Sequence, residues 1–193
     1  MARPRQFDPE EVLDRAIQLF WRKGYDGTSV QEIVDQTGIN RFSLYSAFGD
    51  KRALFLAACE RYRRLVVTKR LETMERSQAG LAAIRSFFSG LIDVLASDRG
   101  WRGCLMTNST VEVAPHDGEA AQQSRAYLER MNTAFYAALV RARARGEIGA
   151  RQSLHDYARY LTTAVQGLAV VAKVTRDSRH LQGIVKSVMG ALE

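Results

Sequence analysis

SVQEIVDQTGINRFSLYSAF, residues 29–48, is the stretch that decides the fold predicted for this chain. Ser29, with Glu32 three residues later, forms a capping box, a pair that begins a helix by bonding its free backbone N–H groups. Gly38 suits the left-handed position that ends a helix, and Asn40 can cap a second one. Two short helices joined by a tight glycine turn form a helix-turn-helix, whose second helix can lie in the major groove of DNA.

A longer helix is expected before this stretch. Asp8 suits its N-cap, Pro9 its first position and Gly24 its end. The apolar stripe expected to be buried consists of Val12, Leu13, Ala16, Ile17 and Phe20. Trp21 and Tyr25 are expected to pack into the same small core. The first fifty residues therefore predict a three-helix unit.

A set of residues in and around this unit is spaced as in one known family. They are Ala16, Phe20, Gly24, Tyr25, Thr28, Ile33, Gly38, Leu44, Tyr45, Phe48, Lys51, Leu54 and Phe55. This pattern resembles the TetR family of bacterial transcriptional repressors; beyond residue 60 the resemblance is one of helical layout. It implies an all-α fold of about nine helices, with a helix-turn-helix DNA-binding domain at 1–50 and a ligand-binding and dimerisation domain at 51–193. A connecting helix is expected at about 51–76.

The charge of the chain is compatible with a polyanionic partner, but its distribution qualifies the argument. The net charge is +7. Residues 1–50 hold six basic and eight acidic side chains, a net of −2, so the expected reading unit is not basic overall. Binding to double-stranded DNA would therefore depend on the placement of a few cations.

Several side chains have the chemistry to contact DNA. Arg41 can pair with guanine O6 and N7, Tyr45 resembles the phosphate-contacting tyrosine of the family, and Thr28 lies at a helix start, where a phosphate could bind. Lys51 opposes the dipole of the helix that it begins, which a phosphate contact would explain. The full set of expected DNA contacts is Arg3, Arg5, Thr28, Asn40, Arg41, Phe42, Ser43, Tyr45, Ser46 and Lys51.

The sequence departs from the commonest family pattern on the second helix of the motif. Phe42 stands where glycine is frequent, Ser46 where histidine is frequent and Ala47 where an aromatic residue is frequent. These differences affect the operator sequence that would be read and leave the DNA-binding class unchanged.

Apolar periodicity predicts a helical bundle after residue 79. Helices are expected at about 79–97, 104–114, 119–145, 153–175 and 177–192. Arg61, Arg63 and Arg64 are expected on a solvated face of the preceding helix. Cys59 and Cys104 are expected as small buried thiols, with a redox role as the alternative.

The resemblance implies two further features of the bundle. One is a pocket for an unknown small-molecule effector, an inducer or a corepressor, lined by Phe87, Phe88, Leu91, Trp101, Met106, Asn108, Glu112, Tyr127, Met131 and Phe135. The other is a homodimer interface on the last two helices, involving Leu161, Val165, Leu168, Ile184, Val188 and Leu192. A dimer would read the two halves of a palindromic operator, and an inducer would shift the connecting helix and release the DNA.

Other functions stay open at this point. Cys104, Glu112 and His116 are near enough in sequence to form a metal or thiol sensor on the same scaffold. An enzyme using His116 is a further alternative, although no nucleophile, metal-ligand or phosphate-loop spacing accompanies the histidines. A helical scaffold that binds no DNA is the third. No cofactor is expected, and the absence of a long apolar run or a signal peptide indicates a cytoplasmic protein without a membrane span.

Overall fold

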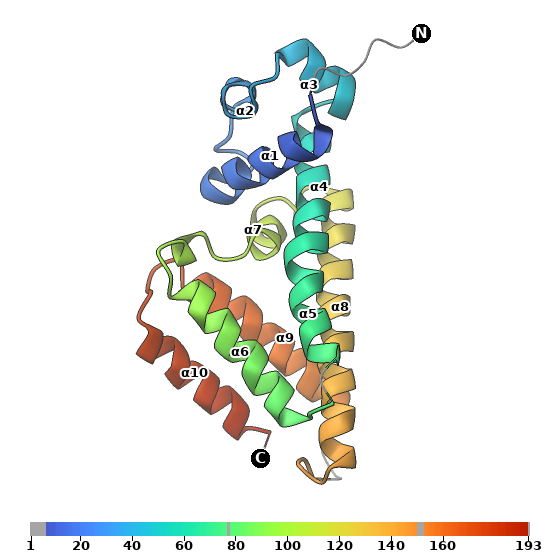
Figure 1. The fold of residues 1–193 in the computed structure, drawn as a ribbon, viewed down its shortest axis with the longest axis vertical. Coiled ribbons are helices and arrows are strands. Elements are labelled where there is room, and N and C mark those ends of the chain that lie inside the picture. The colour runs from blue at the N-terminus through green and yellow to red at the C-terminus, as the bar shows by residue number, and fades with distance from the viewer. Residues whose placement is uncertain (1–6, 77, 150–152, 193) are drawn as a thin grey trace.

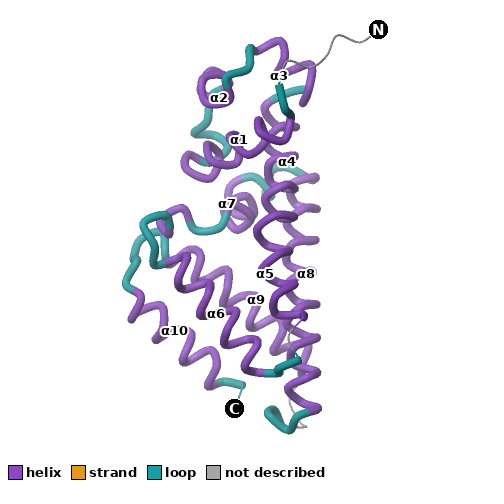
Figure 2. Tube along the Cα trace, viewed as in Figure 1, coloured by secondary structure: helices purple, strands orange, loops and turns teal. Residues whose placement is uncertain are grey.

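The computed structural model describes residues 7–76, 78–149 and 153–192. In these residues every regular element is a helix (Figures 1 and 2), as the all-α prediction requires. A three-helix unit lies at one end of an elongated molecule and a bundle of longer helices makes up the rest (Figure 1). The three-helix unit consists of α1 (Pro9–Lys23), α2 (Val30–Thr37) and α3 (Arg41–Phe48).

The ends of these three helices form as the sequence predicts. The Asp8 side chain accepts a hydrogen bond from the Glu10 N–H and begins α1. Ser29 and Glu32 make both bonds of the capping box at the start of α2. Gly38 ends α2 with a φ of 75°, in the left-handed region that favours glycine. The turn geometry of the helix-turn-helix is therefore set by local side-chain chemistry.

One long helix joins the two parts of the molecule. It consists of α4 (Lys51–Tyr62), the π-helical segment η1 (Arg63–Thr68) and α5 (Lys69–Arg76), which follow each other without a break. The predicted helix at 51–76 is confirmed. Asp50 caps it by accepting a hydrogen bond from the Ala53 N–H. Wide π-helical turns interrupt the regular hydrogen bonding of a helix and occur often at functional sites.

The bundle is completed by five helices and a short turn. They are α6 (Leu81–Leu95), the 3₁₀ turn η2 (Gly100–Arg102), α7 (Leu105–Glu112), α8 (Gly118–Ala144), α9 (Leu154–Val171) and α10 (Ser178–Gly190). With α4 to α5 counted once, the described residues form nine helices besides the short turn, as expected. The main boundary difference is α9, which ends at Val171 instead of about 175.

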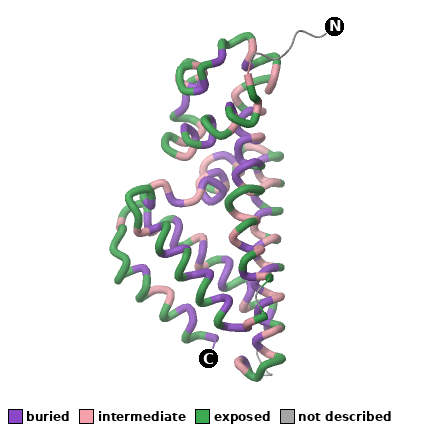
Figure 3. The backbone as a smooth tube through the Cα atoms, viewed as in Figure 1, coloured by how far each residue is buried: buried purple, intermediate pink, exposed green. Residues whose placement is uncertain are grey.

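Buried residues lie along the long helix, α6, α8 and α9 (Figure 3). An aromatic cluster marks the centre, where Phe87 and Phe88 of α6 pack on Phe135 of α8 with ring centroids 5.1 and 5.9 Å from the Phe135 ring. Such pairs add about 0.5–1.5 kcal/mol each beyond the burial of their area. No helix in the described parts of the chain has the length and apolar character needed to cross a membrane.

Arg61 corrects one expectation about the long helix. Its side chain is only 9% exposed and is not part of a solvated face. The guanidinium forms ion pairs with Asp14 and Glu10 of α1, at 2.7 Å in each case. A planar guanidinium can bind two carboxylates at once, so Arg61 fixes α1 against α4.

Candidate nucleic-acid interface and ligand cavity

The outward face of α3 carries the residues expected to read DNA. Arg41, Phe42, Tyr45 and Ser46 are all exposed, and the Phe42 ring is 83% exposed. Leu44 on the opposite face is 1% exposed and anchors α3 in the core. An aromatic ring that exposed contributes little to the stability of the chain, so its position suits contact with another molecule.

Asn40 and Ser43 lie at the start of α3. The Asn40 side-chain oxygen accepts a hydrogen bond from the Ser43 N–H at 2.8 Å and so caps the helix. Asn40 is exposed and Ser43 is half-buried. Both residues lie near the exposed surface of α3, but the Asn40 side-chain oxygen is already bonded as the cap of the helix.

Thr28 corrects an expectation. It is 1% exposed, and its hydroxyl donates to the Gly24 carbonyl at 2.7 Å. The hydroxyl therefore closes the turn between α1 and α2 and does not face a phosphate. Arg3 and Arg5, which were expected to form a DNA-binding arm, lie outside the described residues.

Several charges of the three-helix unit are paired. Arg15 pairs with Glu11, and Lys23 pairs with Glu32. Hydrogen bonds from Lys23 and from Ser29 lower the pKa of Glu32 to about 2. In the described part of the chain Arg41 has no ion-pair partner, so its charge is available to DNA even though the unit is not basic overall.

Three residues that were predicted to line a ligand pocket have other surroundings in the structure. Glu112 accepts a hydrogen bond from the Asp26 N–H at 3.0 Å, so it faces α1 and α2 instead of a ligand pocket. Asn108 donates to the Arg102 carbonyl and accepts from Lys173 at the surface. Trp101 is 41% exposed. The prediction that these three residues line the pocket is therefore wrong for the cavity inside the bundle, because none of them lines it.

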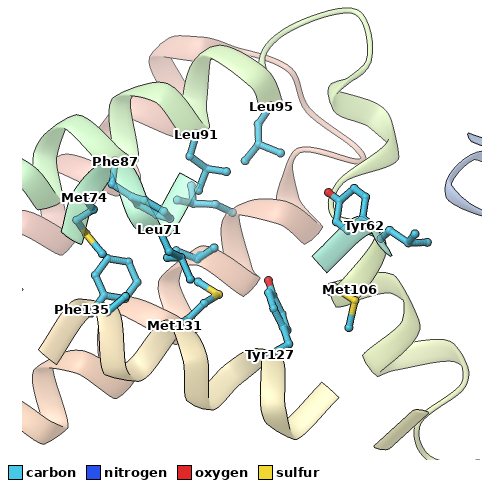
Figure 4. Close-up of a cluster of buried hydrophobic side chains, with 14 of the residues drawn as sticks. Tyr62, Leu71, Met74, Phe87, Leu91, Leu95, Met106, Tyr127, Met131 and Phe135 are labelled. Atoms are coloured by element: carbon cyan, nitrogen blue, oxygen red, sulfur yellow. The ribbon is translucent and has the colours of Figure 1, made fainter. Parts of the chain in front are cut away.

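A cavity of about 70 Å³ lies inside the bundle, beside η1. Of the predicted pocket residues, Phe87, Leu91, Tyr127 and Met131 line it. Phe88, Met106 and Phe135 were also predicted, but they are packed in the surrounding core and do not line the cavity. Figure 4 shows Met106 and Phe135 among the buried side chains around it. The lining residues that sequence reasoning did not assign to a pocket are Trp21, Tyr62, Val66, Val67, Arg70, Leu71, Val94, Leu95, Gly103, Cys104, Val165 and Ala169.

The polar groups of this cavity form a short network. The Tyr62 hydroxyl donates to the Cys104 sulfur at 3.8 Å, and the same sulfur lies 3.7 Å from the Tyr127 hydroxyl. The Gln166 amide donates to the Tyr127 oxygen at 3.1 Å, and Thr107 donates to the Gln166 carbonyl oxygen at 2.7 Å. No sequence signal pointed to Gln166, since its partners lie 39 and 59 positions away.

The two cysteines differ in environment. Cys59 is buried, and burial raises the pKa of its thiol to about 12. Cys104 is half-buried and lines the cavity, which corrects the expectation of two buried thiols. Among the described residues no three Cys, His, Asp or Glu side chains gather as metal ligands, so Cys104, Glu112 and His116 do not form the metal site considered above.

The residues expected at a dimer interface also need correction. Leu161, Val165, Leu168, Val188 and Leu192 are at most 6% exposed and pack inside their own chain. Ile184 is half-buried. The five buried side chains therefore present little surface to a second copy, and Ile184 presents part of its surface. Several exposed residues on α9 and just beyond its C-terminal end recur at helical spacing and form one outward stripe: Tyr160, Thr163, Gly167, Val170 and Val174.

Comparison with protein families supports both parts of the chain. Residues 12–58 match the bacterial regulatory proteins of the tetR family. Residues 80–188 match the tetracyclin repressor-like C-terminal domain. The first match includes the helix-turn-helix and the first part of α4, and the second includes most of the bundle.

The chain is also similar to individual transcriptional regulators. The chain is 36% identical to the HTH-type transcriptional regulator YezE of Bacillus subtilis (strain 168), with both chains covered completely. It is 28% identical to the HTH-type transcriptional repressor ComR of Escherichia coli (strain K12), over 97% of this chain and 90% of ComR. Among solved structures, a cysteine mutant of the TetR family transcriptional regulator CifR in complex with 26-base-pair operator DNA matches with a TM-score of 0.86 and 27% identity, over 99% of this chain and 100% of CifR.

Proposed function

The chain belongs to the TetR family of bacterial regulatory proteins and is a DNA-binding transcription regulator, and from this we propose that it is a homodimeric repressor that a small molecule releases from its operator. The observation that carries the proposal is the outward face of α3, where Arg41, Phe42 and Tyr45 are exposed on the second helix of a helix-turn-helix. The CifR structure, which contains operator DNA, supports placing this face in the major groove.

The contacts that we propose divide into two kinds. Arg41 would read a base edge, because a guanidinium can donate two parallel hydrogen bonds to guanine. Phe42 would meet an apolar thymine methyl, while Tyr45 and Lys51 would bind phosphates and fix the register. Asn40, Ser43 and Ser46 lie on the same surface and complete the set.

We propose the domain division of the family for this chain, with residues 1–50 binding DNA and 51–193 binding effector and partner. The first turns of α4 belong structurally to the DNA-binding part. Phe55 of α4 packs on Phe20 and Tyr25 with ring centroids 5.1 and 5.0 Å apart, so α4 completes the core of the three-helix unit.

For the homodimer, we propose the outward stripe of α9 as a central part of the interface. Val170 is 49% exposed and Val174 is 90% exposed, which is costly for apolar side chains that face only water. Gly167 and Thr163 between the larger side chains allow a partner helix to approach closely. A dimer presents two α3 helices to two operator half-sites about one helical turn apart, which one short helix cannot do.

Effector control is proposed from the cavity beside η1. A ligand there would contact the long helix that also carries Lys51 at its start, so occupation of the cavity can change the position of α4 against α1. The effector needs only to bind the released state better than the DNA-bound state. The proposed role involves no catalytic step.

Fluorescence anisotropy tests this function. Labelled DNA that flanks the coding region of the protein is titrated at several salt concentrations, with scrambled DNA of equal length as the control. We expect saturable binding to the flanking DNA, far tighter than to scrambled DNA and weakened steeply by salt. A pull-down of genomic DNA fragments with the protein detects an operator that lies elsewhere in the genome. Equal, weak binding to all fragments in both experiments would contradict the proposed function.

A further inference from the structure

The cavity beside η1 has walls of a particular chemistry. Most of its lining is aliphatic or aromatic, no carboxylate lines it, and Arg70 is its one charged lining residue among the described residues. Its volume of about 70 Å³ is about half that of a cavity that binds benzene. It therefore suits a molecule of roughly three or four non-hydrogen atoms that is largely apolar.

Two hydrogen-bond donors point into this space. Figure 4 shows the Tyr62 and Tyr127 hydroxyls directed toward the interior between α6 and α8. Burial raises the pKa of both tyrosines well above the usual value, so both hydroxyls stay protonated. The Gln166 amide nitrogen donates to the Tyr127 oxygen at 3.1 Å, and the Tyr127 proton has two long contacts to acceptors, the Gln166 carbonyl oxygen at 3.4 Å and the Cys104 sulfur at 3.7 Å.

The acceptor that these hydroxyls now share is a poor one. Both hydroxyls lie 3.7–3.8 Å from the Cys104 sulfur. A thiol sulfur is a weak acceptor, whereas a carbonyl or alcohol oxygen is a strong one. A ligand oxygen placed between the two rings would therefore gain two good hydrogen bonds at the expense of weak contacts.

One wall of the cavity belongs to the DNA-binding unit. Trp21 is on α1, and its ring packs edge-on against Tyr62 with a centroid distance of 5.2 Å. Its indole N–H donates to the Arg102 carbonyl at 3.1 Å, and Arg102 also donates to Gln18 of α1 at 2.8 Å. This corrects the expectation that Trp21 packs only into the three-helix core.

The segment whose backbone carbonyl accepts the Trp21 hydrogen bond also contributes to the cavity wall. Gly103 and Cys104 line the cavity and directly follow Arg102. A ligand that moves these residues would move the carbonyl to which Trp21 is bound. The bundle thus contacts α1 at the position where a ligand would sit.

We propose that the effector is a small, neutral molecule with one hydrogen-bond-accepting oxygen, held by the Tyr62 and Tyr127 hydroxyls, and that Trp21 transmits its binding to the DNA-reading helices. This inference rests on the proposed function, since it names the effector class and the coupling residue of the same regulator. An open groove of about 840 Å³ between α5 and α6 shares Val66, Arg70 and Phe87 with the cavity and supplies the route inward.

The test uses acetone as the probe and isobutene as its isostere without an oxygen. The chain has two tryptophans, so the Trp101→Phe variant leaves Trp21 as the only one to report by fluorescence. A ligand of four non-hydrogen atoms binds at best with a Kd of about 0.04 mM, and the titration extends to about 10 mM to include weaker binding. We expect acetone to change Trp21 emission saturably and to weaken operator binding over the same concentration range.

Variants identify the binding groups. Tyr62→Phe and Tyr127→Phe should each weaken acetone binding about three- to tenfold. Tyr136→Phe is the matched control, because Tyr136 packs on His155 outside the cavity. Trp21→Phe should retain acetone binding, measured by calorimetry, and reduce its effect on operator affinity.

The alternative outcomes are distinct. Equal responses to acetone and isobutene, or responses that both tyrosine variants retain, would overturn the acceptor class. A response to acetate and not to acetone would mean that Arg70 binds an anion and would also overturn it. No change in Trp21 emission, in a protein that binds its operator, would reject the inference and leave the proposed function intact, whereas loss of operator binding itself would reject the proposed function.

Discussion

Lys51 and Tyr25 form a cation–π pair, with the Lys51 ammonium 4.3 Å from the centroid of the Tyr25 ring. Lys51 is the first residue of α4, where the helix dipole disfavours a cation. The electron-rich face of the tyrosine compensates for part of that cost. The lysine therefore has a structural reason for its position in addition to the phosphate contact proposed above.

Lys51→Ala separates the phosphate contact from base reading. We expect weaker binding to operator and scrambled DNA alike, with the slope of log K against log salt reduced by about 1. Arg41→Ala should instead cost about 1–3 kcal/mol on the operator and less on scrambled DNA. Anisotropy on both DNAs measures the two effects, and Lys186→Ala on α10 is the control for loss of an exposed lysine. A Lys51→Ala salt slope equal to that of the parent would mean that Lys51 serves only Tyr25.

Phe42→Ala should affect DNA binding without affecting stability. The ring is 83% exposed, so its removal should change the free energy of unfolding by no more than about 0.5 kcal/mol. Leu44→Ala on the buried face should cost about 2–5 kcal/mol of stability. Urea denaturation and operator titration distinguish these effects. Unchanged operator affinity in Phe42→Ala would exclude this ring from the interface.

Gly24→Ala should destabilise the joint between the two parts of the chain. Gly24 has a φ of 77° and ψ of 178°, a region essentially restricted to glycine, and an added Cβ would lie 2.7 Å from a Glu112 carboxylate oxygen. We expect a loss of about 1–3 kcal/mol in the free energy of unfolding. Glu112→Ala in the same chain should remove the steric part of that loss. Gly146→Ala is the control, since Gly146 has a φ of 73° but no neighbour near an added Cβ.

Charge on the outward stripe of α9 should separate the proposed dimer. Val170→Glu combined with Val174→Glu places two like charges on each facing surface. Sedimentation should then show a shift toward monomer, together with weaker operator binding. Val111→Glu is the matched control, because Val111 is 70% exposed on α7 and lies outside the stripe. A dimer that persists in the double variant would place the interface elsewhere.

Stability should fall in acid because several carboxylates are stabilised in the charged form. A hydrogen bond from Arg52 lowers the pKa of Asp117 to about 2, and a hydrogen bond from Arg61 lowers the pKa of Asp14. A pKa lowered by folding gives stability that is complete above the unfolded-state value and is lost as the pH falls through the folded-state value. The loss should therefore run from about pH 5 to about pH 2.

Urea denaturation at pH 7, 5, 4 and 3 measures this dependence. Asp117→Asn should flatten the curve, since asparagine retains the N-cap of α8 but has no proton to gain. Asp156→Asn is the control for an exposed carboxylate. An unfolding free energy that stays constant from pH 5 to pH 3 would contradict the role assigned to these ion pairs.

Local chemistry explains why much of the fold could be predicted. Asp8, Ser29, Asn40 and Asp50 each bond a backbone N–H two or three residues away, and Gly38 adopts its left-handed turn without a distant partner. Apolar periodicity placed the longer helices, because one face of each must be buried. The outward face of α3 followed from the same spacing, once Leu44 was assigned to the core.

The cavity and the joint depend on distant residues, and sequence reasoning mostly failed there. Glu112 bonds a backbone group 86 positions away, and Trp21 bonds one 81 positions away. Nothing local distinguishes a tryptophan in a three-helix core from one that lines a cavity between two parts of the chain. The same holds for Leu161 and Val165, whose apolar character fits an internal core and a dimer interface equally well.

The sequence by itself determined the helices, their ends and the family, because these depend on capping, turn geometry and periodicity over a few residues. Only the tertiary structure decided that Arg61 binds α1, that Thr28 is buried, and that Tyr62, Cys104 and Tyr127 share a cavity with Trp21. The physical reason is that a side chain's environment is set by whichever helix packs against it, and that choice follows from the packing of the whole chain.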